Sequence, residues 1–249
     1  MRILLVSDLH YSLPQFDWVV AQAPAYDLVV LAGDQLDLAS PVPLEAQSVV
    51  VLQYLQMLRE TGRVAVSSGN HDLTGPDAAG EQAALWLDDA RALGVPTDGA
   101  SIRIDDTLVS IFPWWDGPVG KEAVVAQMAA DEAVRPARWI WVYHWPPFGS
   151  PTCWTGRRHY GDEDLGPWID RFRPDMVLTG HVHEPPFKHD GAWADRIGDT
   201  WVFNPGRQMG PVPTHIEIDL AASTANWWSL AGAEDIDLTL PQAPERTAV

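Results

Sequence analysis

Five short segments of the chain concentrate the side chains that bind metals and transfer protons. They hold five of the eight histidines and read, in order, Asp8-Leu9-His10, Gly33-Asp34-Gln35-Leu36-Asp37, Gly69-Asn70-His71-Asp72, His144 and Gly180-His181-Val182-His183. In an extended segment, side chains two positions apart face the same way, so His181 and His183 can direct both imidazoles to one place. Such a pair indicates a metal site; the alternative is one packed and one solvated histidine.

The donor groups in these segments are imidazoles, carboxylates and an amide, with no thiolate among them. This set suits divalent manganese, iron or zinc better than a structural zinc site or a soft metal. A metal site also requires that side chains from several segments meet in space. The elements that precede the segments decide whether they can.

Each segment closely follows a short apolar run that predicts a buried strand. The runs cover residues 2–6, 28–31, 64–66, 139–143 and 176–179. Residues 14–22 and 44–60 have the apolar spacing of helices and separate the first three runs. This alternation implies parallel strands with right-handed crossovers, and ligands bind beyond the carboxyl ends of such strands. We therefore expect the five segments to converge.

Similar patterns predict the remaining elements. Helices are expected over residues 80–93, over residues 121–133, and from a cap at Asp162 to a stop before Pro174; strands are expected over residues 102–104, 107–112, 200–203, 214–220 and 225–230. Residues 241–249 are expected to be a frayed tail, so that residues 1–240 form a single domain.

The composition fits one large α/β domain. The chain has 249 residues and a net charge of −18, from 16 basic and 34 acidic residues. Such a charge repels polyanions, although bound divalent cations reverse the field locally. The single cysteine, Cys153, suits a reducing compartment, and no apolar run has the length of a transmembrane helix. We expect a cytoplasmic protein without a nucleic-acid or membrane partner; the sequence does not indicate an oligomeric state.

The five segments, in this order and each at the end of a predicted strand, resemble the calcineurin-like metallophosphoesterases. Pro146-Pro147 after His144 and Asn204-Pro205-Gly206 after the paired histidines are also similar to that family, so the resemblance spans roughly residues 3–207. It implies an α/β fold in which two facing mixed β-sheets are flanked by helices, a four-layer α/β/β/α sandwich. It also implies a hydrolase of phosphate esters.

The resemblance further implies a site for two divalent metal ions, manganese, iron or zinc. Carried over residue by residue, it assigns Asp8, His10 and His183 to one ion, Asn70, His144 and His181 to the other, and Asp34 to a bridge between them. A bridging carboxylate keeps two like-charged ions about 4 Å apart, so that both can contact one phosphate. Glycines at positions 33, 69 and 180 are expected to let the chain turn sharply beside the ions.

By the same resemblance, His71 is a catalytic residue rather than a ligand. It would protonate the leaving group, while Asp37 accepts a hydrogen bond from its other nitrogen and fixes the tautomer. The alternative for Asp37 is an ordinary turn or cap aspartate. The expected reaction is in-line attack of a metal-bridging hydroxide on phosphorus, with Asn70 and the ions stabilising the developing charge. Asp72 is expected to be structural.

Two positions depart from the Ser/Thr protein phosphatases of this superfamily. Those enzymes have arginine where this chain has Leu38 and glutamate where it has Asp72. We therefore disfavour a protein phosphatase. Phosphodiesters are slightly preferred as substrates, because no obvious cap domain closes over a small monoester. A phosphomonoesterase or nucleotidase is the alternative, and a non-catalytic protein-binding scaffold on the same fold is less favoured because the ligands and His71 are all present.

Several residues are candidates for contact with the small phosphoester substrate. Arg207 stands where the family often has a small residue, and it would reach the phosphate or a second substrate group; the alternative is a surface salt bridge. Arg157, Arg158 and His159 lie in the loop after His144, with solvated loop charges as the alternative.

Tryptophans near the predicted site suggest an aromatic wall. Trp145 adjoins a ligand, and Trp114 and Trp115 follow a predicted strand. Such a wall would stack on a base or an aryl ester. The alternative is packing over the rim of the site.

Overall fold

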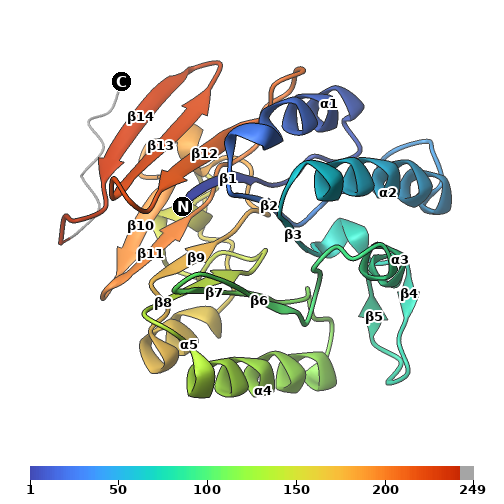
Figure 1. Ribbon diagram of the computed structural model, residues 1–249. Helices are drawn as coiled ribbons and strands as arrows, with labels where there is room; N and C mark the ends of the chain where they lie inside the picture. Colours follow the sequence, from blue (N-terminus) through green and yellow to red (C-terminus); the bar gives the residue numbers. More distant parts are fainter. Residues whose placement is uncertain (242–249) are drawn as a thin grey trace.

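Two six-stranded sheets face each other in the middle of the molecule, and helices cover their outer sides (Figure 1). The computed structural model describes residues 1–241. The first sheet has the order β14-β13-β12-β1-β2-β3, and the second has the order β10-β11-β9-β8-β7-β6. This is the predicted sandwich of two mixed sheets between helical layers.

In the first sheet, β1, β2 and β3 are parallel, and β12 pairs with β1 in the antiparallel direction. Its strands are β1 (Arg2–Val6), β2 (Leu28–Ala32), β3 (Val64–Ser67), β12 (His215–Asp219), β13 (Thr224–Ser229) and β14 (Gly232–Asp237). The outer face is covered by α1 (Leu13–Gln22), α2 (Leu44–Thr61) and α3 (Leu87–Ala92).

In the second sheet, the neighbours β7, β8, β9 and β11 are parallel, and β6 and β10 are antiparallel edge strands. Its strands are β6 (Ser101–Ile104), β7 (Thr107–Ile111), β8 (Arg138–Val142), β9 (Met176–Leu178), β10 (Ala194–Ile197) and β11 (Thr200–Phe203). The outer helices are α4 (Pro118–Val134) and α5 (Leu165–Phe172).

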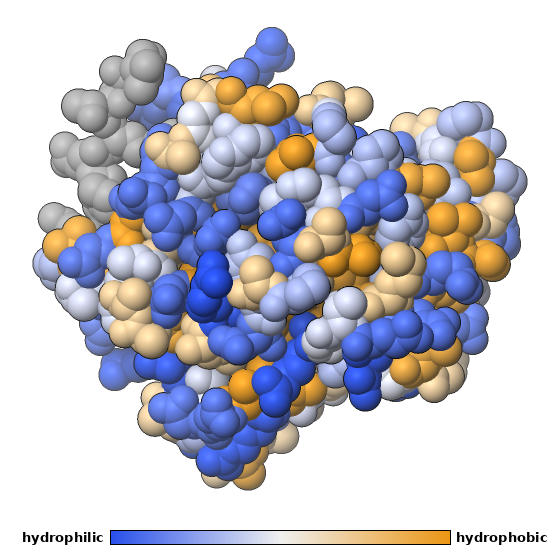
Figure 2. All heavy atoms as spheres, turned by 45° about the horizontal axis from the view of Figure 1, so that its top comes forward, coloured by the Kyte–Doolittle hydropathy of each residue, from blue (hydrophilic) through white to orange (hydrophobic). Residues whose placement is uncertain are grey.

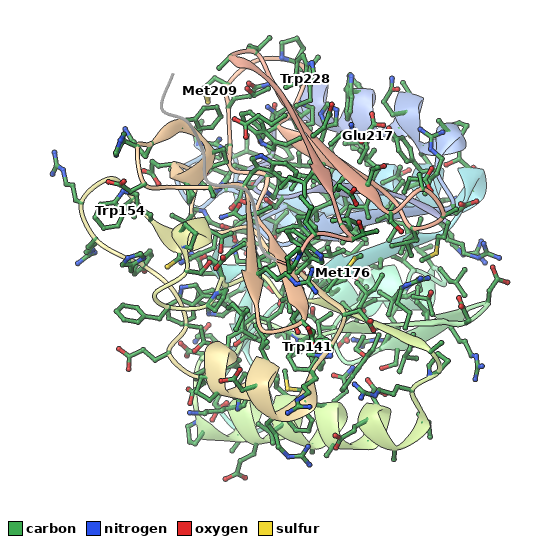
Figure 3. All side chains as sticks on the ribbon, turned by 90° about the vertical axis from the view of Figure 1, so that its left-hand side faces the viewer. Trp141, Trp154, Met176, Met209, Glu217 and Trp228 are labelled. Carbon is green, nitrogen blue, oxygen red and sulfur yellow. The ribbon has the colours of Figure 1, made fainter. Side chains whose placement is uncertain are left out.

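Alternation along the central strands explains why their sequences are apolar throughout. In β1, Ile3 and Leu5 face the core between the sheets, whereas Leu4 and Val6 pack under the outer helices. In β8, Ile140 belongs to the central core and Trp141 to the outer one; Figure 3 shows Trp141 above the helices of that side. Strands buried on both faces need apolar side chains at every position.

Two predicted helix boundaries are wrong, and in each case a carboxylate is hydrogen-bonded to a distant residue instead. The helix expected over residues 80–93 is only α3, because residues 82–83 form β5 (Gln82–Ala83), which pairs with β4 (Gly75–Pro76). The Glu81 carboxylate accepts the Val119 and Gly120 N–H groups at the start of α4. Glu81 therefore serves the amino terminus of another helix, where a negative charge is favourable.

The other wrong boundary is the cap at Asp162. Asp164 occupies the N-cap position of α5. The Asp162 carboxylate instead accepts the Tyr143 hydroxyl at 2.5 Å and the Asp164 N–H at 2.9 Å. The Asp162 carboxylate, which the sequence alone assigned to the helix end, thus accepts a hydrogen bond from a buried tyrosine just after β8.

Hydrophilic residues are spread over the face shown in Figure 2, and hydrophobic ones form separate groups. No helix in the described part of the chain is both long enough and apolar enough to cross a membrane. The tail predicted over residues 241–249 lies, apart from Pro241, outside the described residues, and the single-domain organisation stays a prediction.

Candidate metal centre

The strand ends of both sheets bring the five polar segments together, as the topology predicts. Asp8 follows β1, Asp34 follows β2 and His144 follows β8, while Asn70 opens a short 3-10 helix after β3. Backbone hydrogen bonds join neighbouring segments, with the Asp8 N–H donating to Gly33 O at 3.0 Å. The segments therefore form one rigid rim.

Several of these residues have a strained backbone. Asp8, His10, Asp34 and His181 have φ angles of 56°, 43°, 56° and 67°, in the left-handed region. Non-glycine residues rarely adopt this region, and such strain concentrates at functional sites. The rim thus has the backbone signature of a site that serves a function rather than stability.

The three glycines beside the site play two different parts. Gly33 has a φ of +91°, so it turns the chain as predicted. All three glycines are also needed for space, and a Cβ at Gly33 would lie 2.1 Å from His144 Nδ1. A Cβ at Gly69 would lie 2.2 Å from Asp34 Oδ1, and one at Gly180 would lie 2.6 Å from Asp8 Oδ2.

The first group of ligands is Asp8, His10 and His183. Their donor atoms lie within 4.8 Å of one another. His10 Nε2 is 3.2 Å from His183 Nε2, and His183 Nε2 is 3.4 Å from Asp8 Oδ1. All three side chains therefore face one point, as expected for ligands of a single ion.

The second group is Asp34, His144 and His181, whose donor atoms also lie within 4.8 Å of one another. Asn70 joins this group, because its Oδ1 is 2.8 Å from His181 Nδ1. Asp34 Oδ2 lies 3.3 Å from His144 Nε2 and 3.7 Å from His10 Nε2. The Asp34 carboxylate thus stands between the two groups, where a bridging ligand would be.

The side chains fit divalent cations. Asp8 and Asp34 are only 0% and 2% exposed. Burying two carboxylates so close together is costly unless positive charge lies beside them, and divalent cations would supply that charge. His144 Nε2 and His181 Nε2 are buried without a hydrogen-bond partner among residues 1–241. His144 Nδ1 donates to Ala32 O at 2.5 Å, which orients the ring and leaves the lone pair of Nε2 for a metal.

The pKa values of the imidazoles also fit a site for divalent cations. Burial lowers the pKa of His10 to about 4 and that of His181 to about 3, so both are neutral at pH 7 and can act as ligands. Burial also disfavours a charged His144, but the Asp34 carboxylate outweighs it and raises the pKa to about 9. A cation binding at Asp34 and His144 would take the place of that proton.

His71 lies against both groups. Its backbone N–H donates to Asp34 Oδ1 at 2.9 Å, and its ring centroid is 4.4 Å from that of His10. The Leu38 N–H donates to His71 Nδ1 at 3.2 Å, so the neutral ring carries its proton on Nε2. A ring nitrogen of His71 also lies within 4.8 Å of donor atoms of His10 and Asp34, close enough for ligation.

Asp37 differs from its expected geometry. Its Oδ1 is 3.7 Å from His71 Nδ1, beyond hydrogen-bond distance, and it accepts the Ala39 N–H at 2.9 Å instead. This is the turn geometry that was the alternative for Asp37. Asp72 is structural, as expected, since its buried carboxylate accepts the N–H groups of Leu36 and Gly69.

Aromatic rings pack around His181, but they are only partly the predicted ones. Trp114 and Trp145 stack at 5.0 Å, with centroids 5.0 and 5.6 Å from that of His181. Tyr160, which is 43% exposed, lies 5.1 Å from the same ring. Trp115 instead donates its indole N–H to Tyr143 Oη at 2.7 Å. Of the three tryptophans named from the sequence, Trp114 and Trp145 thus have ring contacts with His181 in the described structure, and Tyr160 was not predicted.

The charged residues of the 145–161 loop lie farther from the ligands. Arg157 and Arg158 are exposed, and the Arg158 guanidinium lies 5.4 Å from the centre of the Tyr160 ring. His159 packs at 5.0 Å against Trp154, which Figure 3 shows on the outlying part of the loop. Arg207, in contrast, donates from Nε to the carbonyl oxygen of Asp8 at 3.0 Å.

Comparisons with known proteins identify a family for the sequence and structures of similar fold. A model of the calcineurin-like phosphoesterase family matches residues 1–185. The chain is similar in fold to the crystal structure of TT1561 of Thermus thermophilus, with 16% identity, a TM-score of 0.59, and 95% of this chain and 98% of that chain covered.

A second similar structure is the purple acid phosphatase PPD1 from yellow lupin (Lupinus luteus). The identity is 13% and the TM-score 0.54, with 98% of this chain and 52% of that chain covered. The chain therefore spans about half the length of that phosphatase. No curated protein matches the sequence.

Proposed function

Because this chain belongs to the calcineurin-like phosphoesterase family, we propose that it hydrolyses phosphate esters with two divalent metal ions. The observation that carries the proposal is the position of Asp34. Its carboxylate lies near His10 of the first group of ligands and near His144 of the second, so it could serve an ion in each. Asp8, His10 and His183 would hold one ion, and Asn70, His144 and His181 the other. Manganese is the proposed metal, with iron or zinc as alternatives for this donor set.

When bound, two such ions neutralise phosphate charge and activate water for in-line attack on phosphorus. The chain supplies the remaining parts. The Asn70 amide lies beside His181 at 2.8 Å, where its N–H groups can stabilise charge that develops on phosphate oxygens. His71 would protonate the departing oxygen from Nε2 as the imidazolium, since a neutral imidazole is too weak an acid, and would be left as the neutral ring whose Nδ1 accepts the Leu38 N–H.

We propose phosphodiesters as slightly preferred substrates, because we expect residues 1–240 to form a single domain without a cap that closes over a small monoester. In manganese, kcat/KM should be higher for bis-p-nitrophenyl phosphate than for p-nitrophenyl phosphate. The reverse order would indicate a phosphomonoesterase or nucleotidase. Absence of hydrolysis of both, by protein that holds its metals, would reject the hydrolase and favour a protein-binding scaffold. The cytoplasmic location stays a prediction.

The aromatic rings around His181 should bind the ring of an aryl or nucleotide substrate. Tyr160 is the most exposed of them, so Tyr160→Ala should weaken phenylphosphonate binding about three- to tenfold, the range of one aromatic pair. Methylphosphonate binding should not change. Calorimetry on manganese-loaded protein measures both affinities.

Phe148→Ala is the matched control, because Phe148 is an exposed aromatic residue of the same loop that packs on His159 instead. It should leave both phosphonates unaffected. An equal loss for phenyl- and methylphosphonate in Tyr160→Ala would show a general distortion of the site and would contradict stacking.

A further inference from the structure

The turn at residues 204–207 has a fixed shape. The buried Asn204 amide donates to Val182 O at 2.9 Å, and its Oδ1 accepts the Gly206 N–H at 2.9 Å. Gly206 has a φ of +69°, and a Cβ there would lie 2.9 Å from His183 O. The Thr214 hydroxyl donates to Gly206 O at 2.5 Å. Residue 207 is therefore held at a defined place beside the first group of ligands.

Arg207 is fastened to that group at two points. Its backbone N–H donates to His183 O at 3.1 Å, and its Nε donates to Asp8 O at 3.0 Å. The side chain is partly buried, whereas Met209, labelled in Figure 3 two residues further along, is 75% exposed. The Nε bond fixes the plane of the guanidinium and leaves its two Nη groups to other partners.

Those two Nη groups have no protein partner in the part of the chain that the structure describes. Within residues 1–241, no carboxylate lies within ion-pair distance of Arg207, and neither Nη donates a hydrogen bond. Acidic residues outnumber basic ones by 34 to 16, so the chain has enough carboxylates to pair every arginine and lysine, yet Arg207 has none beside it in residues 1–241. The surface salt bridge that was the alternative for Arg207 is thus absent from the described part.

The hydrogen bonds of Arg207 also fix its side of the site. Its Nε donates to Asp8 O and its backbone N–H donates to His183 O, so the guanidinium lies on the flank formed by Asp8, His10 and His183. The rings of Trp114 and Trp145 pack against His181, in the second group of ligands.

We propose that Arg207 binds an oxyanion of the substrate through its two Nη groups, on the flank of Asp8, His10 and His183. A planar guanidinium with two parallel N–H donors matches the oxygens of a phosphate or carboxylate. The inference rests on the proposed phosphoesterase function and extends it to the substrate class. The oxyanion is either the phosphoryl group under attack or a second anionic group of the substrate.

Isothermal titration calorimetry of inorganic phosphate into manganese-loaded protein tests whether Arg207 binds the phosphoryl group under attack. Arg207→Gln should bind phosphate at least about tenfold more weakly, because a charge-assisted hydrogen-bonded pair is lost. Arg207→Lys keeps the positive charge but lacks the paired N–H donors of the guanidinium, so its affinity for phosphate should fall about threefold or more. If Arg207→Gln does not fold, Arg207→Lys is tested in its place. Manganese content is measured on every sample.

Arg63→Gln is the matched control, because Arg63 is an exposed arginine just before β3, at the end of the strand away from Asn70. It carries the same change in charge and should bind phosphate like the unaltered protein. An equal loss in Arg63→Gln and Arg207→Gln would mean a general field effect and would overturn the assignment.

A pair of diesters tests whether Arg207 instead binds a second anionic group of the substrate. Methyl and carboxymethyl p-nitrophenyl phosphate share a leaving group and differ by one carboxylate. A rise in KM confined to the carboxymethyl ester in Arg207→Gln, with phosphate affinity unchanged, assigns Arg207 to a second anion. Unchanged phosphate affinity and unchanged KM for both esters would overturn the inference. If the unaltered protein binds phosphate but hydrolyses no ester, the proposed function fails and the calorimetry still decides the role of Arg207.

Discussion

Asp34→Asn should abolish the two-ion site and lower kcat by at least about a thousandfold, which corresponds to several kcal/mol of lost charge stabilisation. Asp34 Oδ2 lies 3.3 Å from His144 Nε2 and 3.7 Å from His10 Nε2, so this one carboxylate serves both groups of ligands. Asparagine keeps the shape but removes the negative charge. Metal analysis of the purified variant should find at most one ion per chain, against two in the unaltered protein.

Asp131→Asn is the control for the loss of a buried carboxylate. Asp131 is 8% exposed and accepts the hydroxyls of Ser101 and Ser110 under α4, away from the ligand groups. That variant can lose stability, but it should keep both ions and its activity per folded molecule. Two ions bound by Asp34→Asn, with near-normal kcat, would show that Asp34 is not the bridge.

His71→Ala should lower kcat by about a hundredfold to ten-thousandfold on a diester with an alkyl leaving group, the usual contribution of a positioned acid. The loss should be much smaller with p-nitrophenyl esters, because that leaving group departs without a proton. The imidazolium would transfer its Nε2 proton to the alkoxide, and the neutral ring that remains accepts the Leu38 N–H at Nδ1. Parallel kinetics on the two ester types measure the difference.

Metal analysis of His71→Ala separates the two possible roles of this residue. A proton donor can be lost without loss of metal, whereas a ligand of an ion shared with His10 and Asp34 cannot. Asp37→Asn is the companion variant, and because Asp37 does not accept from His71 it should change kcat only slightly. An unchanged rate on the alkyl ester in His71→Ala would remove the proton-donor role.

The fold and the ligand groups were accessible from the sequence because each functional segment is attached to a strand end. A run such as Leu28-Val29-Val30-Leu31 identifies a strand buried on both faces, and parallel strands deliver their carboxyl ends to one rim. The resemblance to a known family then divided the ligands into two groups. The structure brings Asp8, His10 and His183 together in one cluster and Asp34, His144 and His181 together in another, and the division of the ligands between two ions stays a prediction.

What the sequence could not show depends on backbone groups and on contacts between distant residues. The donor to His71 Nδ1 is the main-chain N–H of Leu38, which any residue carries. Trp114 and Trp115 lie in an irregular segment, where no periodicity tells which ring faces the ligands. Glu81 is drawn out of a helix by the start of α4, 38 residues further along the chain.

The most direct test of the proposed function is the rate of bis-p-nitrophenyl phosphate hydrolysis as manganese is returned to metal-stripped protein. We predict no hydrolysis without metal, and activity that rises until two ions are bound per chain and then stays constant. Asp34→Asn should remain inactive throughout the titration. Hydrolysis by fully stripped protein, or full activity with no bound ion, would contradict a two-metal phosphoesterase built on Asp34.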